Sequence, residues 1–178
     1  MKLITACQKF NILIFDNYEN HNLLKEDYLD YLENHPDIQQ KQTYVQATMT
    51  HWFLHKETLQ LNLFQNFAYD CIRRSFCPQD LPEYVNMRMN SIWGNIYRKG
   101  DYAKSHDHNP SKFSFVYFLK SKPNFSPLCF ENDSNHGNEL ISVDALEGRF
   151  VVFPGYIHHS VPIHTYEETR ITISGNFY

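Results

Sequence analysis

Three histidines in two separate stretches of this sequence could together bind a metal ion. His106 and His108 stand one residue apart, and on an extended strand the side chains at i and i+2 point to the same side. His158 and His159 follow later as an adjacent pair. Because neighbouring side chains of a strand point to opposite sides, at most one of this pair can join the first two. Three ligands on one side of a metal leave its other positions open, as oxygen chemistry at non-haem Fe(II) requires.

An arginine downstream of these histidines could hold an anion. Residues 170–177 alternate between polar and apolar, so the strand predicted there has two distinct faces. The polar face combines Arg170 with three small polar residues, Thr172, Ser174 and Asn176. A guanidinium in such surroundings suits a carboxylate, which it binds through two parallel hydrogen bonds. The alternative is an ion pair between Arg170 and Glu167 or Glu168.

The C-terminal half of the chain has the pattern of short antiparallel strands. Alternating runs recur from residue 84 onward, at residues 87–97, 112–120, 128–131, 140–143, 149–153, 157–161 and 169–178. Turn-forming residues separate these runs, among them Lys99-Gly100-Asp101, the segment 132–137 and Pro154-Gly155. Many short strands at this spacing predict a mainly β sandwich, jelly roll or barrel.

Helices are predicted in the N-terminal half. After a strand over residues 9–16, apolar residues near helical spacing predict a helix from His21 to Asn34, and a second helix from Glu57 to Phe76. In the second helix we expect a buried stripe formed by Leu59, Leu63, Phe67 and Cys71, which Phe64 and Ala68 widen. Residues 37–55 are expected to be loop with at most one short strand. These helices would buttress one sheet of the β domain.

Length, charge and cysteine content limit the class of protein. A chain of 178 residues with 42% hydrophobic residues predicts a single domain, 1–178, with helical support in 1–83 and the β core in 84–178. The net charge of −4 and the lack of a basic run argue against a nucleic-acid partner. The four cysteines show no metal-binding spacing, and no stretch has the length of a signal peptide or membrane span. The sequence thus predicts a cytoplasmic protein with reduced thiols.

The order of these motifs resembles the Fe(II)/2-oxoglutarate-dependent oxygenase superfamily, most closely a bacterial and phage group related to prolyl hydroxylases. The matching elements are Trp93-x-Asn95 with Gly100-Asp101-Tyr102, then His106-x-His108, the aromatic strand Val116–Leu119, the segment Gly148–Pro162 and the segment Arg170–Asn176. The resemblance covers residues 84–178 well and the N-terminal helices loosely. It implies a double-stranded β-helix, which is a cupin-like jelly roll.

The resemblance also implies roles for individual residues. His106 and His159 would be iron ligands, and Arg170 would bind the far carboxylate of 2-oxoglutarate. Asn95 and Tyr97 resemble the Asn and Tyr that contact this co-substrate in related proteins; the alternative is that they only fill the sheet interior. Tyr117 and Asn176 are weaker candidates for the same pocket, and His158 is expected at the surface or behind the ligands.

One position departs from the superfamily pattern. The usual second ligand is the Asp of an H-x-D motif, whereas this chain has His108 there. We expect His108 as the third ligand, which removes one negative charge from the iron site. Asp107 could take its place only if a bulge turned it inward. Halogenating members have a small residue at this position, so His108 argues against halogenation.

The implied function is oxidative. Fe(II), 2-oxoglutarate and O2 would be used to hydroxylate an aliphatic C–H bond of an amino-acid, peptide or other small-molecule substrate, with release of succinate and CO2. Two rival functions are a three-histidine cupin-like metalloenzyme that does not use 2-oxoglutarate and a non-catalytic jelly-roll binding module. A nucleic-acid demethylase ranks below both because of the acidic balance.

Overall fold

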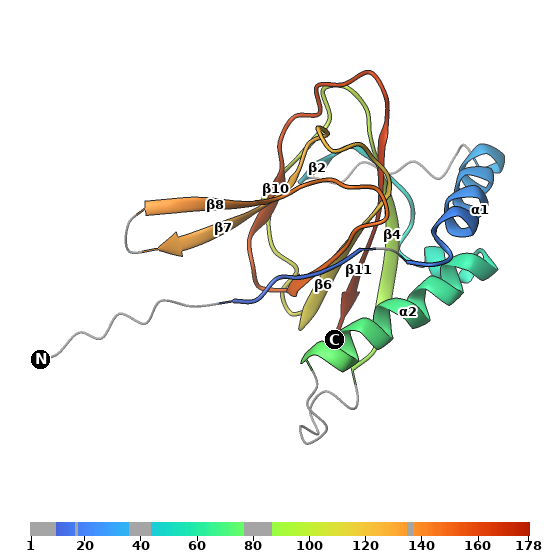
Figure 1. The fold of residues 1–178 in the computed structure, drawn as a ribbon, viewed down its shortest axis with the longest axis horizontal. Helices are drawn as coiled ribbons and strands as arrows, with labels where there is room; N and C mark the ends of the chain where they lie inside the picture. The colour runs from blue at the N-terminus through green and yellow to red at the C-terminus, as the bar shows by residue number, and fades with distance from the viewer. Residues whose placement is uncertain (1–9, 17, 36–43, 77–86, 135–136) are drawn as a thin grey trace, which may run out of the picture.

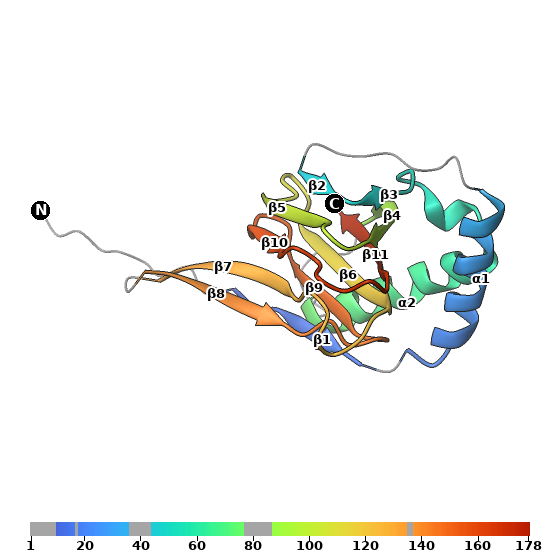
Figure 2. The same cartoon turned by 90° about the horizontal axis from the view of Figure 1, so that it is seen from above.

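Two antiparallel sheets face each other, with two helices outside one of them (Figures 1 and 2). The structure is a computed structural model that describes residues 10–16, 18–35, 44–76, 87–134 and 137–178. In strand order, the larger sheet consists of β1 (Leu13–Phe15), β9 (Phe150–Pro154), β6 (Phe113–Lys120), β11 (Arg170–Phe177), β4 (Met89–Tyr97) and β3 (Thr48–Met49). The smaller sheet consists of β2 (Val45–Gln46), β5 (Tyr102–His106), β10 (His159–Val161), β7 (Leu128–Ser134) and β8 (Gly137–Val143). The predicted mainly β architecture with N-terminal helices is confirmed.

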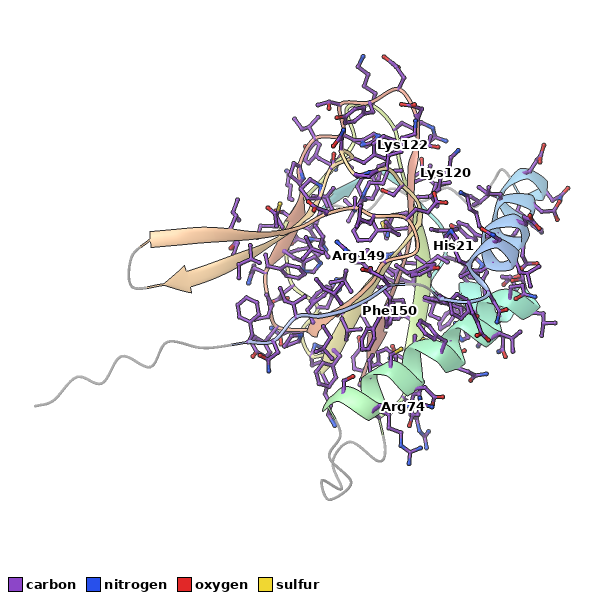
Figure 3. The ribbon with its side chains drawn as sticks, viewed as in Figure 1. His21, Arg74, Lys120, Lys122, Arg149 and Phe150 are labelled. Carbon is purple, nitrogen blue, oxygen red and sulfur yellow. The ribbon has the colours of Figure 1, made fainter. Side chains whose placement is uncertain are left out.

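The helices cover the outer face of the larger sheet. They are α1 (His21–Asn34) and α2 (Leu59–Phe76), and the short 3-10 helix η1 (Leu54–Lys56) precedes α2. Apolar side chains of α1 and α2 form one cluster with outward-facing residues of the larger sheet. Phe150 of β9, labelled in Figure 3, lies in this cluster with its ring centroid 5.5 Å from that of Phe67. No helix in the described residues is both long and apolar enough to cross a membrane.

The buried stripe of α2 differs from the predicted one. Leu59 is 69% exposed and Leu63 is 41% exposed. Phe64 and Ala68, predicted to widen the stripe, are fully buried, together with Leu61 and Ile72, which were not predicted. Both sets recur at intervals of three or four residues, so helical periodicity alone fits either face. Packing against the sheet selects the face that carries Phe64, which contacts Phe115 and Phe150.

Several strands differ from their predicted limits. The expected strand over residues 9–16 is limited to Leu13–Phe15 among the described residues, and two short strands, β2 and β3, form where at most one was expected. β5 was not among the alternating runs, although an extended strand was expected to carry His106 and His108. Of the segment 132–137, predicted as a turn, residues 132–134 continue β7, residue 137 begins β8, and residues 135–136 lie outside the described residues; β7 and β8 project from the body (Figure 2). Polar residues were interpreted as a turn here, but strands that project from the body need not carry the apolar residues of a buried strand.

The two faces of β11 look into different environments. Ile171, Ile173 and Phe177 belong to the cluster with the helices. The polar face looks toward the smaller sheet, where a second apolar cluster fills the space between the sheets. In the pairing of β11 with β4, Arg170 lies opposite Tyr97, and Thr172 lies opposite Asn95. Polar side chains therefore meet between the sheets at one end of the sandwich.

Candidate active site

Three histidine rings converge between the sheets. His106 ends β5, His159 begins the neighbouring β10, and His108 reaches the same point from the segment just after β5. Their ring centroids are separated by 4.4 Å (His106 and His159), 5.0 Å (His108 and His159) and 5.2 Å (His106 and His108). Each offers a nitrogen within 4.8 Å of those of the other two. The arrangement can hold one metal ion. β5 ends at His106, so His108 does not lie on the extended strand that was expected to carry both residues.

Of the adjacent histidines 158 and 159, the fold selects His159. Its side chain is 4% exposed and lies inside the sandwich, with its ring centroid 4.7 Å from that of Phe153. His158 is exposed and uses its backbone carbonyl to accept a hydrogen bond from the amide of Glu131. The expectation that His158 lies at the surface is therefore confirmed.

Backbone carbonyls orient two of the three rings. His106 Nδ1 lies 2.7 Å from the carbonyl oxygen of Lys104, and His159 Nδ1 lies 3.1 Å from that of Ile157. Because a carbonyl oxygen can only accept, both Nδ1 atoms must donate, so each ring keeps its proton there. The lone pair of Nε2 is then free on both rings. This is the arrangement usual for metal-binding histidines, and neutral imidazole suits Fe(II) as a ligand.

The surroundings favour the neutral form of all three rings. Burial lowers the pKa of His108 to about 4, and the nearby His106 contributes to that decrease. Burial also lowers the pKa of His106, and it lowers that of His159 well below its ordinary value. At neutral pH the cluster therefore carries no protons that a metal would have to displace.

Asp107 lies between two of the histidines in sequence and lines the same cavity. Its two carboxylate oxygens accept hydrogen bonds from the backbone amide of Asn109, at 3.3 Å, and from its side-chain amide, at 2.9 Å. In the described residues, the group of side chains close enough to share one ion consists of the three histidines and leaves Asp107 out. The geometry thus favours His108 over Asp107 as the third ligand.

Within the described residues, the Arg170 guanidinium is buried in the same cavity next to Tyr97 and has no hydrogen-bond acceptor. Its side chain is 1% exposed, and within the described part of the chain Nε and both terminal nitrogens have no acceptor. The guanidinium carbon lies 4.7 Å from the ring centroid of Tyr97 and 4.9 Å from that of Phe118. Burial lowers the pKa of Arg170, although a guanidinium remains charged at neutral pH. A buried charge with unused donors is costly, and a bound anion would remove that cost.

The alternative ion pairs of Arg170 do not form. Glu167 instead accepts a hydrogen bond of 2.5 Å from Lys99, and Glu168 accepts one of 2.6 Å from Lys122. Both carboxylates stand at the surface. The hypothesis that Arg170 is neutralised by a neighbouring glutamate is therefore wrong.

Asn95 and Tyr97 both line the cavity that contains Arg170 and the histidines. The side-chain nitrogen of Asn95 donates to the hydroxyls of Thr172, at 3.3 Å, and Ser174, at 3.1 Å, and its oxygen is buried with no partner among the described residues. Burial raises the pKa of Tyr97, so its hydroxyl keeps its proton. Each residue therefore brings a polar group to the wall of the cavity.

Tyr117 and Asn176, the two weaker candidates, do not line the cavity. Tyr117 points to the outer face of β6, where its hydroxyl lies 2.6 Å from Nδ1 of His21, which is labelled in Figure 3. Asn176 lies on the inner face but farther along β11, and its oxygen accepts a hydrogen bond of 2.8 Å from Ser114. The prediction that these residues belong to the co-substrate pocket is wrong for both.

Three aromatic residues near the histidines were not predicted to line the cavity. The cavity has a volume of about 200 Å³ and is also lined by Tyr44, Trp52 and Trp93. The Trp93 ring centroid lies 5.7 Å from that of His108, and Trp52 contacts Trp93 at 4.5 Å. Trp93 was recognised only as part of a motif. Tyr44 and Trp52 come from a segment with no readable pattern, so only the fold could place them here.

Comparison with protein families supports an oxygenase. Residues 91–176 match the sequence model of the family described as "Putative 2OG-Fe(II) oxygenase". This segment contains all three histidines together with Asn95, Tyr97 and Arg170. No curated protein matches the chain.

Solved structures with the same fold include several oxygenases. A prolyl-4-hydroxylase of Pseudomonas putida is 13% identical, with 94% of this chain and 92% of that chain covered and a TM-score of 0.71. A prolyl hydroxylase of Trichoplax adhaerens, in complex with a hypoxia inducible factor peptide, is 13% identical, with 94% and 83% covered and a TM-score of 0.70. HygX of Streptomyces hygroscopicus, with nickel and 2-oxoglutarate bound, is 10% identical, with 94% and 82% covered and a TM-score of 0.70.

At these identities the structural similarity establishes the fold, and the predicted double-stranded β-helix is confirmed. The family match establishes the resemblance expected from the motifs. The donor atoms fit the family's needs, since the histidines offer imidazole nitrogens and Arg170 offers unused donors for a carboxylate. Residues 91–176 are thus similar to the 2OG-Fe(II) oxygenase family, and this match, the shared fold and the three-histidine group together support a dioxygenase that uses Fe(II), 2-oxoglutarate and O2.

Proposed function

We propose that this enzyme hydroxylates an aliphatic C–H bond of an amino-acid, peptide or other small-molecule substrate and releases succinate and CO2. In this proposal His106, His108 and His159 bind the iron, and Arg170 binds the far carboxylate of 2-oxoglutarate. The observation that carries the proposal is the burial of an unpartnered guanidinium in the same cavity as three imidazoles. A metal and a dicarboxylate together would satisfy both groups.

Each wall of the cavity has a defined part in this proposal. Backbone carbonyls hold Nδ1 of His106 and of His159, which leaves Nε2 of each ring free to bind the metal. Arg170 can donate two parallel hydrogen bonds to a carboxylate, and its position between Tyr97 and Phe118 limits how far the guanidinium can turn. Iron, when bound, supplies the activation of O2. The apolar lining, including Val116, Leu128 and Val161, keeps water away from the co-substrate.

Asn95 and Tyr97 are proposed to contact 2-oxoglutarate. Asn95 already uses its side-chain nitrogen within the sheet, so the group that it presents depends on how its amide is oriented. In the opposite orientation the oxygen would accept from the hydroxyls of Thr172 and Ser174, and the nitrogen would donate into the cavity. The Tyr97 hydroxyl can donate to a carboxylate because burial keeps its proton in place.

The substrate class rests on the structural relatives. One of them is in complex with a peptide, and HygX has also been solved with hygromycin B bound. Exposed aromatic rings of Tyr44 and Trp52 at the cavity offer an apolar surface for a substrate of either kind. We also propose a cytoplasmic location, because Cys71 and Cys129 are both free thiols.

Anaerobic titration with Fe(II) and 2-oxoglutarate tests the proposal. A visible charge-transfer band should appear with the wild-type protein and be absent from Arg170→Met, whereas a matched surface variant, Arg98→Met, should behave as wild type. A three-histidine enzyme that does not use 2-oxoglutarate would bind iron without the band, and a non-catalytic module would bind neither. Succinate release under O2, screened against amino acids and peptides, then tests the reaction.

A further inference from the structure

The cavity has an unusual inventory of charge. Among the described residues that line it, the charged side chains are Arg170 and Asp107. A histidine that binds a metal through a neutral imidazole contributes no charge, so the three histidines add nothing to this inventory. Among the described residues, Asp107 is therefore the single acidic side chain that lines this cavity.

This inventory matters because the metal site lacks a carboxylate ligand. The facial set typical of non-haem Fe(II) oxygenases has two imidazoles and one carboxylate. With such a set, the charges of the carboxylate ligand, a divalent metal, the arginine and a dianionic co-substrate add up to zero. With three imidazoles the same sum is one positive charge, enclosed in surroundings where uncompensated charge is costly.

We infer that Asp107 compensates this charge from outside the set of ligands and thereby acts as a positioning residue for the metal. This inference rests on the proposed assignment of the three histidines as metal ligands. Asp107 stands between His106 and His108 in the sequence and lines the same cavity. Its carboxylate is not part of the group of side chains that could share one ion.

The carboxylate is held in a fixed position. Both of its oxygens accept hydrogen bonds from Asn109. The segment that follows Asp107 is also anchored, because the amide of His108 donates to the carbonyl of Gly155 at 2.7 Å and the amide of Ser111 donates to the carbonyl of His108 at 2.8 Å. Neutral donors orient the carboxylate without cancelling its charge. A fixed charge of this kind is already in place when the metal arrives.

Asp107→Asn tests the inference because it keeps the shape of the side chain and removes its charge. We expect the dissociation constant for Fe(II), measured anaerobically by chelator competition, to rise about 10- to 100-fold. The affinity of the iron-loaded protein for 2-oxoglutarate should change in the opposite direction, because a more positive centre attracts a dianion more strongly. The charge-transfer band should move to shorter wavelength, since the metal holds its electrons more tightly.

Controls separate this role from a structural one. Asp107→Glu should restore Fe(II) affinity to within a few fold of wild type, and the metal-free Tm should be the same for wild type and Asp107→Asn. Glu131→Gln makes the same charge change on β7, next to the carbonyl of His158, and should leave Fe(II) affinity unchanged. Weakening of both iron and 2-oxoglutarate binding, or an equal effect of Glu131→Gln, would overturn the inference.

Failure of the inference can be told apart from failure of the proposed function. If wild-type protein does not bind Fe(II), or if its binding survives loss of His106 and His159, the proposed ligand set is wrong. If wild type binds Fe(II) through these histidines and Asp107→Asn binds it within twofold of wild type, the ligand set stands and the role of Asp107 is wrong.

Discussion

His159 lies directly opposite His106 in the antiparallel pairing of β10 with β5. The two rings come from residues far apart in sequence, yet their centroids are 4.4 Å apart. The pairing register shifts between His159 and Val161, at the point where the site is built. Such irregularities bend a strand locally and re-aim its side chains. The proposed metal site thus depends on the pairing of two short strands of the smaller sheet.

Removal of either paired histidine should abolish tight metal binding. His106→Ala and His159→Ala each remove one of three ligands, and we expect Ni(II) affinity to fall by more than 100-fold, measured by isothermal titration. His158→Ala is the matched control because this neighbouring side chain is exposed, and it should bind as wild type. Equal losses in His158→Ala and His159→Ala would contradict the proposed site.

Arg170→Met should separate binding from stability. The variant loses the bidentate donor, so 2-oxoglutarate binding should disappear in calorimetry. The metal-free protein should become more stable by about 1–3 kcal/mol in urea unfolding, because a buried charge without a partner is replaced by an apolar side chain. A large loss of stability would mean that the contacts of the guanidinium with Tyr97 and Phe118 outweigh its burial.

The metal-free protein should lose stability as pH falls from about 6.5 toward about 4. Burial lowers the pKa of His108 from 6.5 to about 4 in the folded state. Between these values the unfolded chain takes up a proton that the folded chain excludes, so the free energy of unfolding decreases; above 6.5 this contribution is fully present. Urea unfolding with a chelator at several pH values measures the slope.

His108→Gln is the control for that measurement. The variant removes one titrating ring, so its slope between pH 6.5 and 4 should be shallower, while His106 and His159 maintain the remainder. An unchanged slope in His108→Gln would show that the pH dependence arises elsewhere in the protein.

Gly94→Ala should destabilise the fold at the junction of α1 and the larger sheet. A Cβ at this position would lie 1.6 Å from the hydroxyl oxygen of Tyr28, which is fully buried. We expect a loss of about 1–3 kcal/mol in urea unfolding. Tyr28→Phe removes the clashing oxygen and should recover part of the loss. Alone it should be nearly neutral, because that hydroxyl has no partner among the described residues.

Much of the candidate site could be predicted from local pattern. The alternation along residues 170–177 placed Arg170 on a polar face, and the structure confirms that this face looks into the cavity. The spacing of His106 and His108 was sufficient to suggest a metal site. The first helix has the predicted limits, His21 to Asn34, because a proline follows its last turn.

Other features depended on the tertiary structure. Val116 and Phe118 of β6 belong to the apolar cluster between the two sheets, whereas Tyr117 between them belongs to the cluster with the helices. Alternation separates these two sets, but an aromatic strand that is buried on both faces does not reveal which set faces the site. The same ambiguity applied to α2, where packing selected Phe64 and left Leu59 exposed.

The sequence by itself determined the chemistry available to this protein: imidazoles at 106, 108 and 159, an arginine on a polar strand face, and two antiparallel sheets to carry them. The motifs favoured His159 over His158, but only the tertiary structure brought its ring to the other two and showed that Arg170 has no glutamate partner among the described residues. It also placed Asp107 in the cavity. The physical reason is that periodicity relates side chains within one element, while strand pairing and packing decide which elements meet.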